Sequence, residues 1–483
     1  MGSVPISSFL AGAATVLAFA PFGLQPVALL TFAWLVHLWM HAPPRRCAWR
    51  GFWFGLGLFG AGVSWVYVSL HDFGGMPAPV AAFATVAFCA FLALFPAAAG
   101  WLQARVPASP AARACLLIPA AWVLFEWVLT WIFTGFPWVA VGYAAAGWPL
   151  QGYAPLGGVY AISFLTVSAA GMLWLIVQRK PVFLVPVLLL LGGGEALRHV
   201  TWTERAGEPF KAALVQGNIA LEMKFRPERA PGILETYARL AESTQAKLIV
   251  FPETALPAFF ERIPPAYLAR LEAAAQRNQG DLLVGVPFRD GRDYYNSVVS
   301  LGVSPRQAYH KVHLVPFGEF VPPGFRWTLE LMSIPLSDFS RGATGQAPLA
   351  AAGQRVAVNV CYEDVFGAEI ARSLPQATLL VNMSNVAWFG DSLAPAQHLG
   401  IARMRAIETG RMHLTATNTG ITAAIDRDGR VVKRLAQFTE GLLEVEAQGY
   451  SGATPYVRLK DWPVVVLSLL IFAGFILRAR LSR

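Results

Sequence analysis

Eight long apolar segments constrain this 483-residue chain more than any other feature of its sequence. Most of them reach the roughly 20 residues that a helix needs to cross the hydrocarbon of a bilayer. Seven precede a polar region and one follows it, near 5–22, 26–42, 51–71, 79–103, 114–135, 153–178, 181–199 and 461–478. The pattern predicts a multi-pass helical membrane domain of about eight spans, with seven helices in 1–200 and the last in 458–483.

Basic residues flank these segments in a regular way. They follow the second, fourth, sixth and eighth segments, as Arg45, Arg46 and Arg50, then Arg105 and Arg113, then Arg179 and Lys180, then Arg478, Arg480 and Arg483. Loops rich in Lys and Arg stay in the cytoplasm. We therefore expect both termini to be cytoplasmic and the polar region, 205–450, to be extracytoplasmic.

The net charge of +9 could indicate a nucleic-acid partner. The polar region excludes that interpretation, because residues 201–450 carry 25 Lys and Arg against 25 Asp and Glu. The positive excess belongs to the apolar parts of the chain, where it is a topology signal.

The polar region alternates short runs rich in Val, Ile and Leu with amphipathic helical patterns. The runs "KAALVQGNI", "KLIVF", "DLLVGVPF", "NSVVSLGV", "RVAVNVC", "ATLLVNMSN" and "HLTATNTGITAAI" predict strands, and "ERAPGILETYARLAEST", "PAYLARLEAAAQRNQ" and "PAQHLGIARMRAIETG" predict helices. This mixture is typical of an α/β sandwich in which helices cover buried sheets. Residues 316–345 and 388–395 are loop-like, and the first of these loops is long enough to act as a lid.

Cys361 is the one cysteine of the polar region, so it has no disulfide partner there. An unpaired thiol outside the membrane is a liability unless it is used. Cys361, Glu253 and Lys311 each lie at the end of a predicted strand, where a rigid sheet commonly presents catalytic groups. A thiol needs a base to become a nucleophile, and a carboxylate serves if a dry site raises its pKa. A lysine and the N–H of Tyr362 can stabilise the oxyanion.

The motifs around these three residues resemble a known family. "FPET", "HKVHLVPFGE" and "NVCYEDVF" resemble the Glu–Lys–Cys triad of the nitrilase superfamily, and "LVPFGEFVP", "SNVAWFGDS", "QHLGIARMRAIETGR" and "TNTGITA" resemble its membrane-embedded apolipoprotein N-acyltransferases. The resemblance implies an αββα sandwich with Glu253 as general base, Lys311 as transition-state stabiliser and Cys361 as nucleophile. It also implies roles for Glu319, Tyr362 and Glu363, and contact with lipid or a lid at Phe225, Phe317, Trp388 and Phe389.

The same resemblance implies an activity. An acyl chain passes from a membrane phospholipid, through a Cys thioester in ping-pong order, to the α-amine of the N-terminal diacylglyceryl-cysteine of an apolipoprotein. This is the last step of lipoprotein maturation, at the bacterial inner membrane with a periplasmic catalytic domain. It implies a monomer without cofactor or metal. The chain departs from the family pattern at Phe225, usually Trp, at Val386, often Asp, and at Leu129, where many members carry Arg shortly after the membrane Glu.

Other interpretations stay open at this point. A lone buried Cys is often a core residue, and Glu126, costly in lipid, needs a hydrogen-bond partner whether or not it meets substrate. A membrane-anchored amidase acting on small amides would use the same triad. A transporter with an extracytoplasmic binding module is the alternative outside the enzymes, but it would need several paired ionisable groups among its helices.

Overall fold

The computed structural model describes residues 3–321 and 338–481, and these residues form two compact units. Unit 1 comprises Met1–Tyr67, Pro77–Val200 and Arg458–Arg483, and unit 2 comprises Val68–Met76 and Thr201–Val457. Unit 2 therefore includes nine residues from the N-terminal part of the chain. The sequence marks the loop 316–345 as a possible lid, and its residues 322–337 lie outside the described residues.

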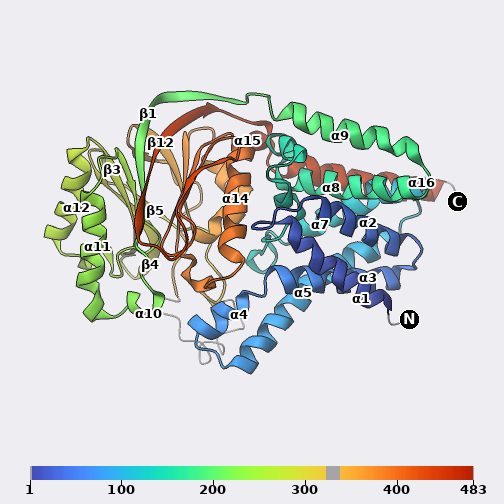
Figure 1. Ribbon diagram of the computed structural model, residues 1–483, viewed down its shortest axis with the longest axis horizontal. Coiled ribbons are helices and arrows are strands. Elements are labelled where there is room, and N and C mark those ends of the chain that lie inside the picture. The colour runs from blue at the N-terminus through green and yellow to red at the C-terminus, as the bar shows by residue number, and fades with distance from the viewer. Residues whose placement is uncertain (1–2, 322–337, 482–483) are drawn as a thin grey trace. The chain divides into compact units, whose positions relative to one another are not determined.

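Unit 1 is helical (Figure 1). Two glycines explain how closely its first and third helices pack: a Cβ at Gly12 or Gly57 would overlap a backbone oxygen of the other helix, at Phe54 and Phe9. Its longer helices are α1 (Ser3–Thr15), α2 (Pro26–Met40), α3 (Pro44–Gly62), α5 (Ala78–Ala104), α7 (Ile118–Val128), α8 (Ala154–Val177), α9 (Leu184–Leu197) and α16 (Trp462–Leu481), with the short α6 (Pro110–Ala112) before α7.

Each predicted apolar segment is largely helical, but the prediction of about eight spans is not confirmed. Among the described residues, four stretches are long and apolar enough to cross a membrane, namely Ala78–Ala104, Pro110–Val128, Pro149–Val177 and Trp462–Leu481. A fifth is possible if Pro44–Gly62 and Val66–Phe73, bent by 58°, count as one. The apolar helices Val4–Ala18, Pro26–Met40 and Pro181–Leu197 fall short, since a helix rises only about 1.5 Å per residue.

Two six-stranded sheets form the centre of unit 2. The first has the order β12-β1-β2-β3-β4-β5, with β12 (Gly441–Gly452), β1 (Thr203–Gln216), β2 (Leu248–Val250), β3 (Asp281–Asp290), β4 (Asp293–Gly302) and β5 (Ala308–His310). The second has the order β11-β10-β9-β8-β7-β6, with β11 (Val431–Arg434), β10 (Ala423–Ile425), β9 (His413–Thr417), β8 (Leu379–Ser384), β7 (Gln354–Val360) and β6 (Leu349–Ala351). β1, β2 and β3 run parallel, as do β7, β8 and β9.

The sheets face each other across an apolar core and helices cover their outer faces, as predicted. The shared core combines β1 to β4 with β7 to β9, through residues such as Leu214, Val250, Val358 and Leu414. On the other face of the first sheet lie α11 (Ala230–Glu242) and α12 (Pro265–Arg277), and α14 (Ala394–Thr409) packs on β9 and β10 (Figure 1). The remaining helices of unit 2 are short: α10 (Leu221–Lys224), α13 (Gly367–Ile370) and α15 (Pro455–Leu459).

One strand prediction is wrong in detail. The run "HLTATNTGITAAI" forms two antiparallel strands, β9 and β10, because the segment around Asn418 and Gly420 turns the chain back. The other predicted strands and the three predicted helices of the polar region are present.

Candidate active site

Two strands end at the candidate site, β2 from the first sheet and β7 from the second. Glu253 lies three residues after β2 in the first sheet, and Cys361 directly follows β7 in the second. Lys311 follows β5, and its N–H donates to the carbonyl of Asn296 in β4. The three predicted residues are close together, since the charges of Glu253 and Lys311 both act on the Cys361 thiol.

Glu253 is buried, with 7% of its surface exposed, and both of its carboxylate oxygens are occupied. Oε1 accepts a hydrogen bond from the side-chain amide of Asn296 at 2.7 Å and lies 3.4 Å from Lys311 Nζ. Oε2 accepts from the backbone N–H of Asn385 at 2.8 Å. The same Asn385 N–H is a hydrogen-bond partner of the Cys361 thiol. These contacts orient the carboxylate of Glu253 beside the thiol.

Lys311 lies between two carboxylates. Its Nζ is 2.8 Å from Glu319 as well as 3.4 Å from Glu253, and only 1% of its surface is exposed. The Asn296 amide also donates to Glu319 at 2.7 Å, so this side chain links both acids. The backbone N–H of Val315 donates to Glu319 at 2.8 Å. Glu319 and Glu253 therefore hold the Lys311 ammonium together, with Asn296 donating to both.

Cys361 lies in a strained turn. Its φ is +51°, in the left-handed region that a residue with a side chain rarely adopts. Strain of this kind persists only when the surroundings fix it, and it is common at functional sites. The carboxylate of Glu363 provides such a constraint, because it accepts hydrogen bonds from the N–H groups of Val360, Val312 and His313. Glu363 thus ties the turn of Cys361 to the segment that follows Lys311.

Tyr309 completes the contacts of Glu363, since its hydroxyl lies 2.9 Å from both carboxylate oxygens. The side chain of Tyr362 is buried and its ring packs edge-on against Phe366 and His313. The Tyr362 side chain therefore supports the turn through packing, which is compatible with a role for its backbone N–H at the reacting carbon.

The pKa values of the cluster follow from burial and neighbouring charge. Burial raises the pKa of the Cys361 thiol, the charge of Glu253 raises it further, and Lys311 offsets only part of this. Burial also raises the pKa of Glu253, but Lys311, the Asn296 hydrogen bond and Lys224 outweigh it, so the net pKa is lowered. Burial lowers the pKa of Lys311, yet the charges of Glu319 and Glu253 outweigh it and raise the net pKa.

The sequence argument required a raised pKa for Glu253, and that prediction is wrong, because the net pKa is lowered. The dry environment is present, but it also contains two ammonium groups and a buried amide donor that stabilise the carboxylate. The directions of these pKa shifts favour an ionised Glu253, an ionised Lys311 and a protonated Cys361 at neutral pH.

The four predicted lipid or lid residues lie on three segments. Phe225 directly follows α10, and Phe317 has a left-handed φ of +61° in the loop after Lys311. Trp388 and Phe389 end a short helical turn, Val386–Phe389. All four are half-buried. The Trp388 carbonyl accepts a hydrogen bond from the Ser69 hydroxyl at 2.8 Å, and its ring meets Phe73 edge-on, so Val68–Met76 packs on this turn.

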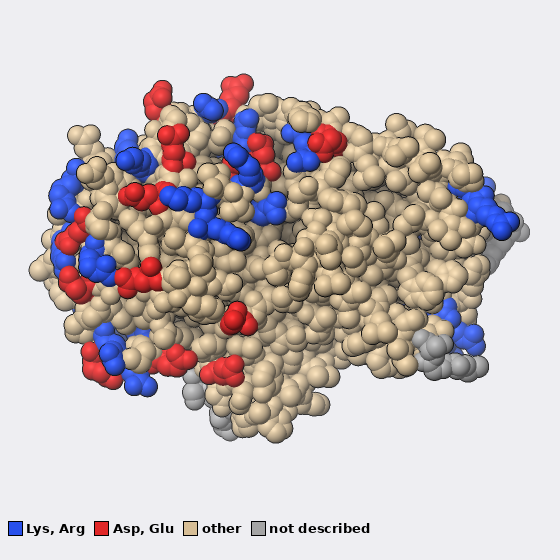
Figure 2. All heavy atoms as spheres, in the orientation of Figure 1, with Lys and Arg blue, Asp and Glu red and all other residues tan. Residues whose placement is uncertain are grey.

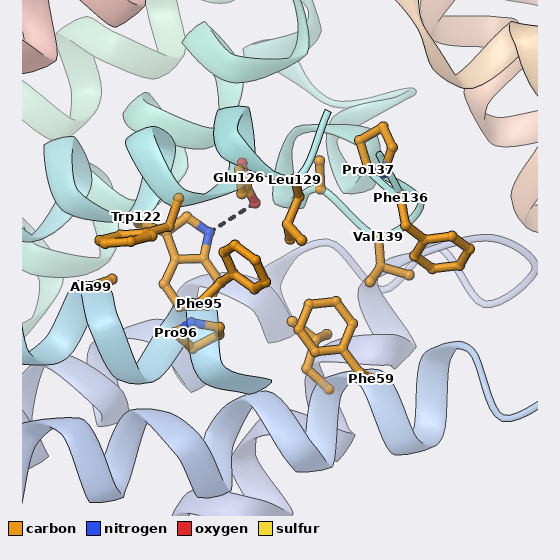
Figure 3. A pocket seen from close by; sticks show the side chains of 13 residues that line it. Phe59, Phe95, Pro96, Ala99, Trp122, Glu126, Leu129, Phe136, Pro137 and Val139 are labelled. Carbon is orange, nitrogen blue, oxygen red and sulfur yellow. Dashed lines mark hydrogen bonds between the residues drawn. The ribbon is translucent and has the colours of Figure 1, made fainter. Parts of the chain in front are cut away.

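Glu126 belongs to unit 1 and has neutral partners. Its Oε1 accepts hydrogen bonds from Trp122 Nε1 and from the N–H of Val141, each at 2.8 Å. Figure 3 shows the carboxyl beside a pocket lined by apolar and aromatic side chains, among them Phe59, Phe95 and Leu129. The hydrogen-bonding requirement inferred from the sequence is met within the unit.

Sequence reasoning missed three residues of the site: Lys224, Asn296 and Asn385. Lys224 directly precedes the predicted Phe225, and its burial was not evident from a motif that reads as polar and exposed. Asn296 lies within a predicted strand whose residues from Asn296 onward are all buried, and a neutral amide carries no chemical signature that would single it out. Within the described residues, no group of three or more His, Cys, Asp and Glu could hold a metal ion.

Comparison with known proteins gives full-length matches. Residues 11–172 match the family model described as the apolipoprotein N-acyltransferase N-terminal domain, and residues 211–456 match carbon-nitrogen hydrolase. The apolipoprotein N-acyltransferase of Nitrosomonas europaea is 49% identical over 480 residues, covering 97% of this chain and 96% of the relative. That of Methylococcus capsulatus is 45% identical over 460 residues, covering 93% and 91%.

A solved structure also matches. A CN-hydrolase superfamily protein from Xanthomonas campestris is 19% identical, with a TM-score of 0.39, covering 54% of this chain and 97% of that chain.

Proposed function

The chain belongs to the apolipoprotein N-acyltransferase family, and on that premise we propose that it transfers an acyl chain from a membrane phospholipid to the α-amine of the N-terminal diacylglyceryl-cysteine of apolipoproteins. The observation that carries the proposal is the convergence of a thiol, a carboxylate and an ammonium from three elements of two sheets. That cluster lies in a chain whose full-length relatives bear the name of this activity.

The proposed first half-reaction forms a thioester on Cys361. Glu253 takes the Sγ proton as the sulfur attacks the ester carbon of the phospholipid. The C–O bond then breaks, and Glu253 returns the proton to the departing oxygen of the lysophospholipid. Because the pKa of Glu253 is lowered and that of the thiol is raised, the proton moves only as the C–S bond forms. A standing thiolate is not required.

Lys311 and the N–H of Tyr362 are the proposed oxyanion donors. The ammonium of Lys311 is fixed by Glu253 and Glu319, so it needs no reorganisation when negative charge develops on the carbonyl oxygen. In the second half-reaction the acceptor amine attacks the thioester, Glu253 takes the amine's proton, and the thiol is restored. The product is an N-acylated lipoprotein.

We propose the topology that the basic residues favour. Residues 1–200 form a membrane bundle of about seven helices, 205–450 a periplasmic catalytic domain, and 458–483 a membrane helix with a basic cytoplasmic tail. Both labelled chain ends lie at one end of unit 1, and on the face shown only Lys and Arg gather there (Figures 1 and 2). This supports cytoplasmic termini, in what we propose is an eight-helix monomer of the inner membrane. Unit 2 mixes both signs of charge on the face shown (Figure 2).

Intact-mass analysis tests the proposed function. The detergent-solubilised protein, incubated with a diacyl phospholipid and no acceptor, should gain one acyl group on Cys361 that hydroxylamine removes. Cys361→Ala should gain none. A diacylglyceryl-cysteine peptide should then discharge the thioester and carry the acyl chain on its α-amine. Hydrolysis of small amides without acylation of the peptide would instead identify a membrane-anchored amidase.

A further inference from the structure

Lys224 is a buried lysine beside the catalytic cluster. It is the last residue of α10, and only 2% of its surface is exposed. Its Nζ donates a hydrogen bond to the backbone carbonyl of Glu253 at 3.2 Å. Lysine is almost never fully buried without a charged partner, because removing an ammonium from water is costly. The carboxylate of Glu253 stabilises the Lys224 ammonium, and so does Cys361 whenever negative charge develops on its sulfur.

The charges of the cluster explain why a second cation is useful there. Glu253 and Glu319 contribute two buried negative charges, and Lys311 contacts both at 3.4 and 2.8 Å. With Lys311 as the only cation, these groups would carry a net charge of about −1 in a poorly solvated site. Any negative charge developing on sulfur or on the substrate carbonyl would then be opposed, since charges interact strongly where water is excluded.

We propose that Lys224 is a positioning residue of the active site. Its buried ammonium holds the backbone of Glu253 and offsets the negative charge that Lys311 leaves unbalanced on Glu253 and Glu319. Cys361 can then attack as its proton leaves. This deepens the proposed function and rests on it. Lys224 keeps its own proton throughout both half-reactions: Glu253 receives the proton of the thiol or the amine and passes it to the leaving group. The ammonium acts through its charge and its hydrogen bond.

The proposed role of Lys224 lowers the folding stability of the protein. Burial lowers the pKa of Lys224 to about 8, although Glu253 and Cys361 raise it. Its folded-state pKa is thus below the usual value of about 10.4, so the charged side chain opposes folding at neutral pH and does so less as the pH rises above 8. If Lys224 had a structural role, its side chain would stabilise the fold. If its role is to place a charge in the active site, its side chain lowers the stability of the fold.

The test uses Lys224→Met, which keeps the length of the side chain and removes the charge. The matched control is Lys211→Met, at an exposed position of β1 in the same unit. Three quantities are compared in the full-length protein: the rate of thioester formation with a diacyl phospholipid, the rate of Cys361 alkylation by iodoacetamide from pH 6 to 10, and the Tm. Peptide mapping separates Cys361 from Cys47, Cys89 and Cys115.

Lys224→Met should slow both thioester formation and alkylation of Cys361 at pH 7 by about 10-fold to 100-fold, somewhat less than the loss of a direct oxyanion donor. Its alkylation profile should shift to higher pH, while its Tm stays equal to or above that of the wild type and Lys211→Met changes none of the three. Unchanged rates would overturn the proposal, and so would a fall in rate accompanied by a fall in Tm. Alkylation needs no acyl donor, so this arm remains informative if no thioester forms in the wild type and the proposed function itself fails.

Discussion

Glu126 in unit 1 and Glu253 in unit 2 are buried to almost the same degree, with 8% and 7% of their surfaces exposed, but their partners differ in kind. Glu126 accepts hydrogen bonds from an indole N–H and a backbone N–H, both neutral. Glu253 lies 3.4 Å from one ammonium, and a second ammonium donates to its backbone carbonyl. Burial alone does not identify a catalytic carboxylate. The charge and arrangement of the groups around it do.

Replacing each of these acids by its amide is the most direct test of this difference between Glu126 and Glu253. Glu253→Gln keeps the shape but removes the base, so thioester formation should fall by about 100-fold to 10,000-fold. In Glu126→Gln the amide oxygen can still accept from Trp122 and Val141, and the rate should remain close to that of the wild type. Intact-mass kinetics measure both. Equal losses in the two variants would mean that Glu126 contributes to the chemistry as well.

The pH dependence of thioester formation sharpens the account of Glu253. Burial raises its pKa, but Lys311, Asn296 and Lys224 lower it by more, so the net folded-state pKa is below the usual range. The base form should therefore persist as the pH falls from 7 to about 4.3, the ordinary value for Glu. The rate should fall, by about tenfold per pH unit, only when the pH drops below the lowered folded-state pKa and the carboxylate is protonated. Loss of half the rate between pH 6 and 7 would instead indicate a raised pKa.

Glu363 provides a third comparison, because it is a buried carboxylate whose oxygens accept hydrogen bonds from three backbone N–H groups and the Tyr309 hydroxyl. In Glu363→Gln, one oxygen that accepts from backbone N–H groups becomes an NH₂ donor. We expect a loss of about 1–3 kcal/mol in the free energy of unfolding and a roughly tenfold slower thioester formation, from misplacement of Cys361. Glu235→Gln, on the exposed face of α11, is the control. A full loss of rate at unchanged stability would assign Glu363 a direct catalytic role.

The sequence predicts the reactive residues of the site better than their supports. Glu253, Lys311 and Cys361 have unusual chemistry and fall at strand ends, and their motifs resemble a family. Asn296 and Asn385 act through an amide and a backbone N–H, groups that every strand or turn supplies. Their function depends on the distance between two sheets, which no local pattern encodes.

The limits of prediction in the fold have a similar cause. The long strand β12 pairs with β1 although more than 200 residues separate them, and no local pattern names a partner so distant in the chain. Its residues 443–448 alternate between apolar and polar side chains, a strand signal that the sequence prediction did not use. Local periodicity predicts α11, α12 and α14 because each carries its own apolar face. The number of membrane spans is harder to predict than the presence of helices, because Pro and Gly shorten helices that hydropathy alone extends.

A change in Val68–Met76 gives the smallest expected effect. This segment belongs to unit 2, although it overlaps the end of the third apolar segment, 51–71. The Ser69 hydroxyl donates to the Trp388 carbonyl at 2.8 Å. Removing it in Ser69→Ala should cost about 0.5–1.5 kcal/mol locally, which corresponds to roughly twofold to tenfold more opening of the Trp388 turn. Hydrogen exchange at residues 386–390 should accelerate by that factor, with a smaller change in thioester formation. Ser7→Ala removes a hydrogen bond that stays within α1 and is the control. If exchange at 386–390 is unchanged in Ser69→Ala, the contact contributes nothing to the order of that turn, and the turn depends on unit 2's other residues alone.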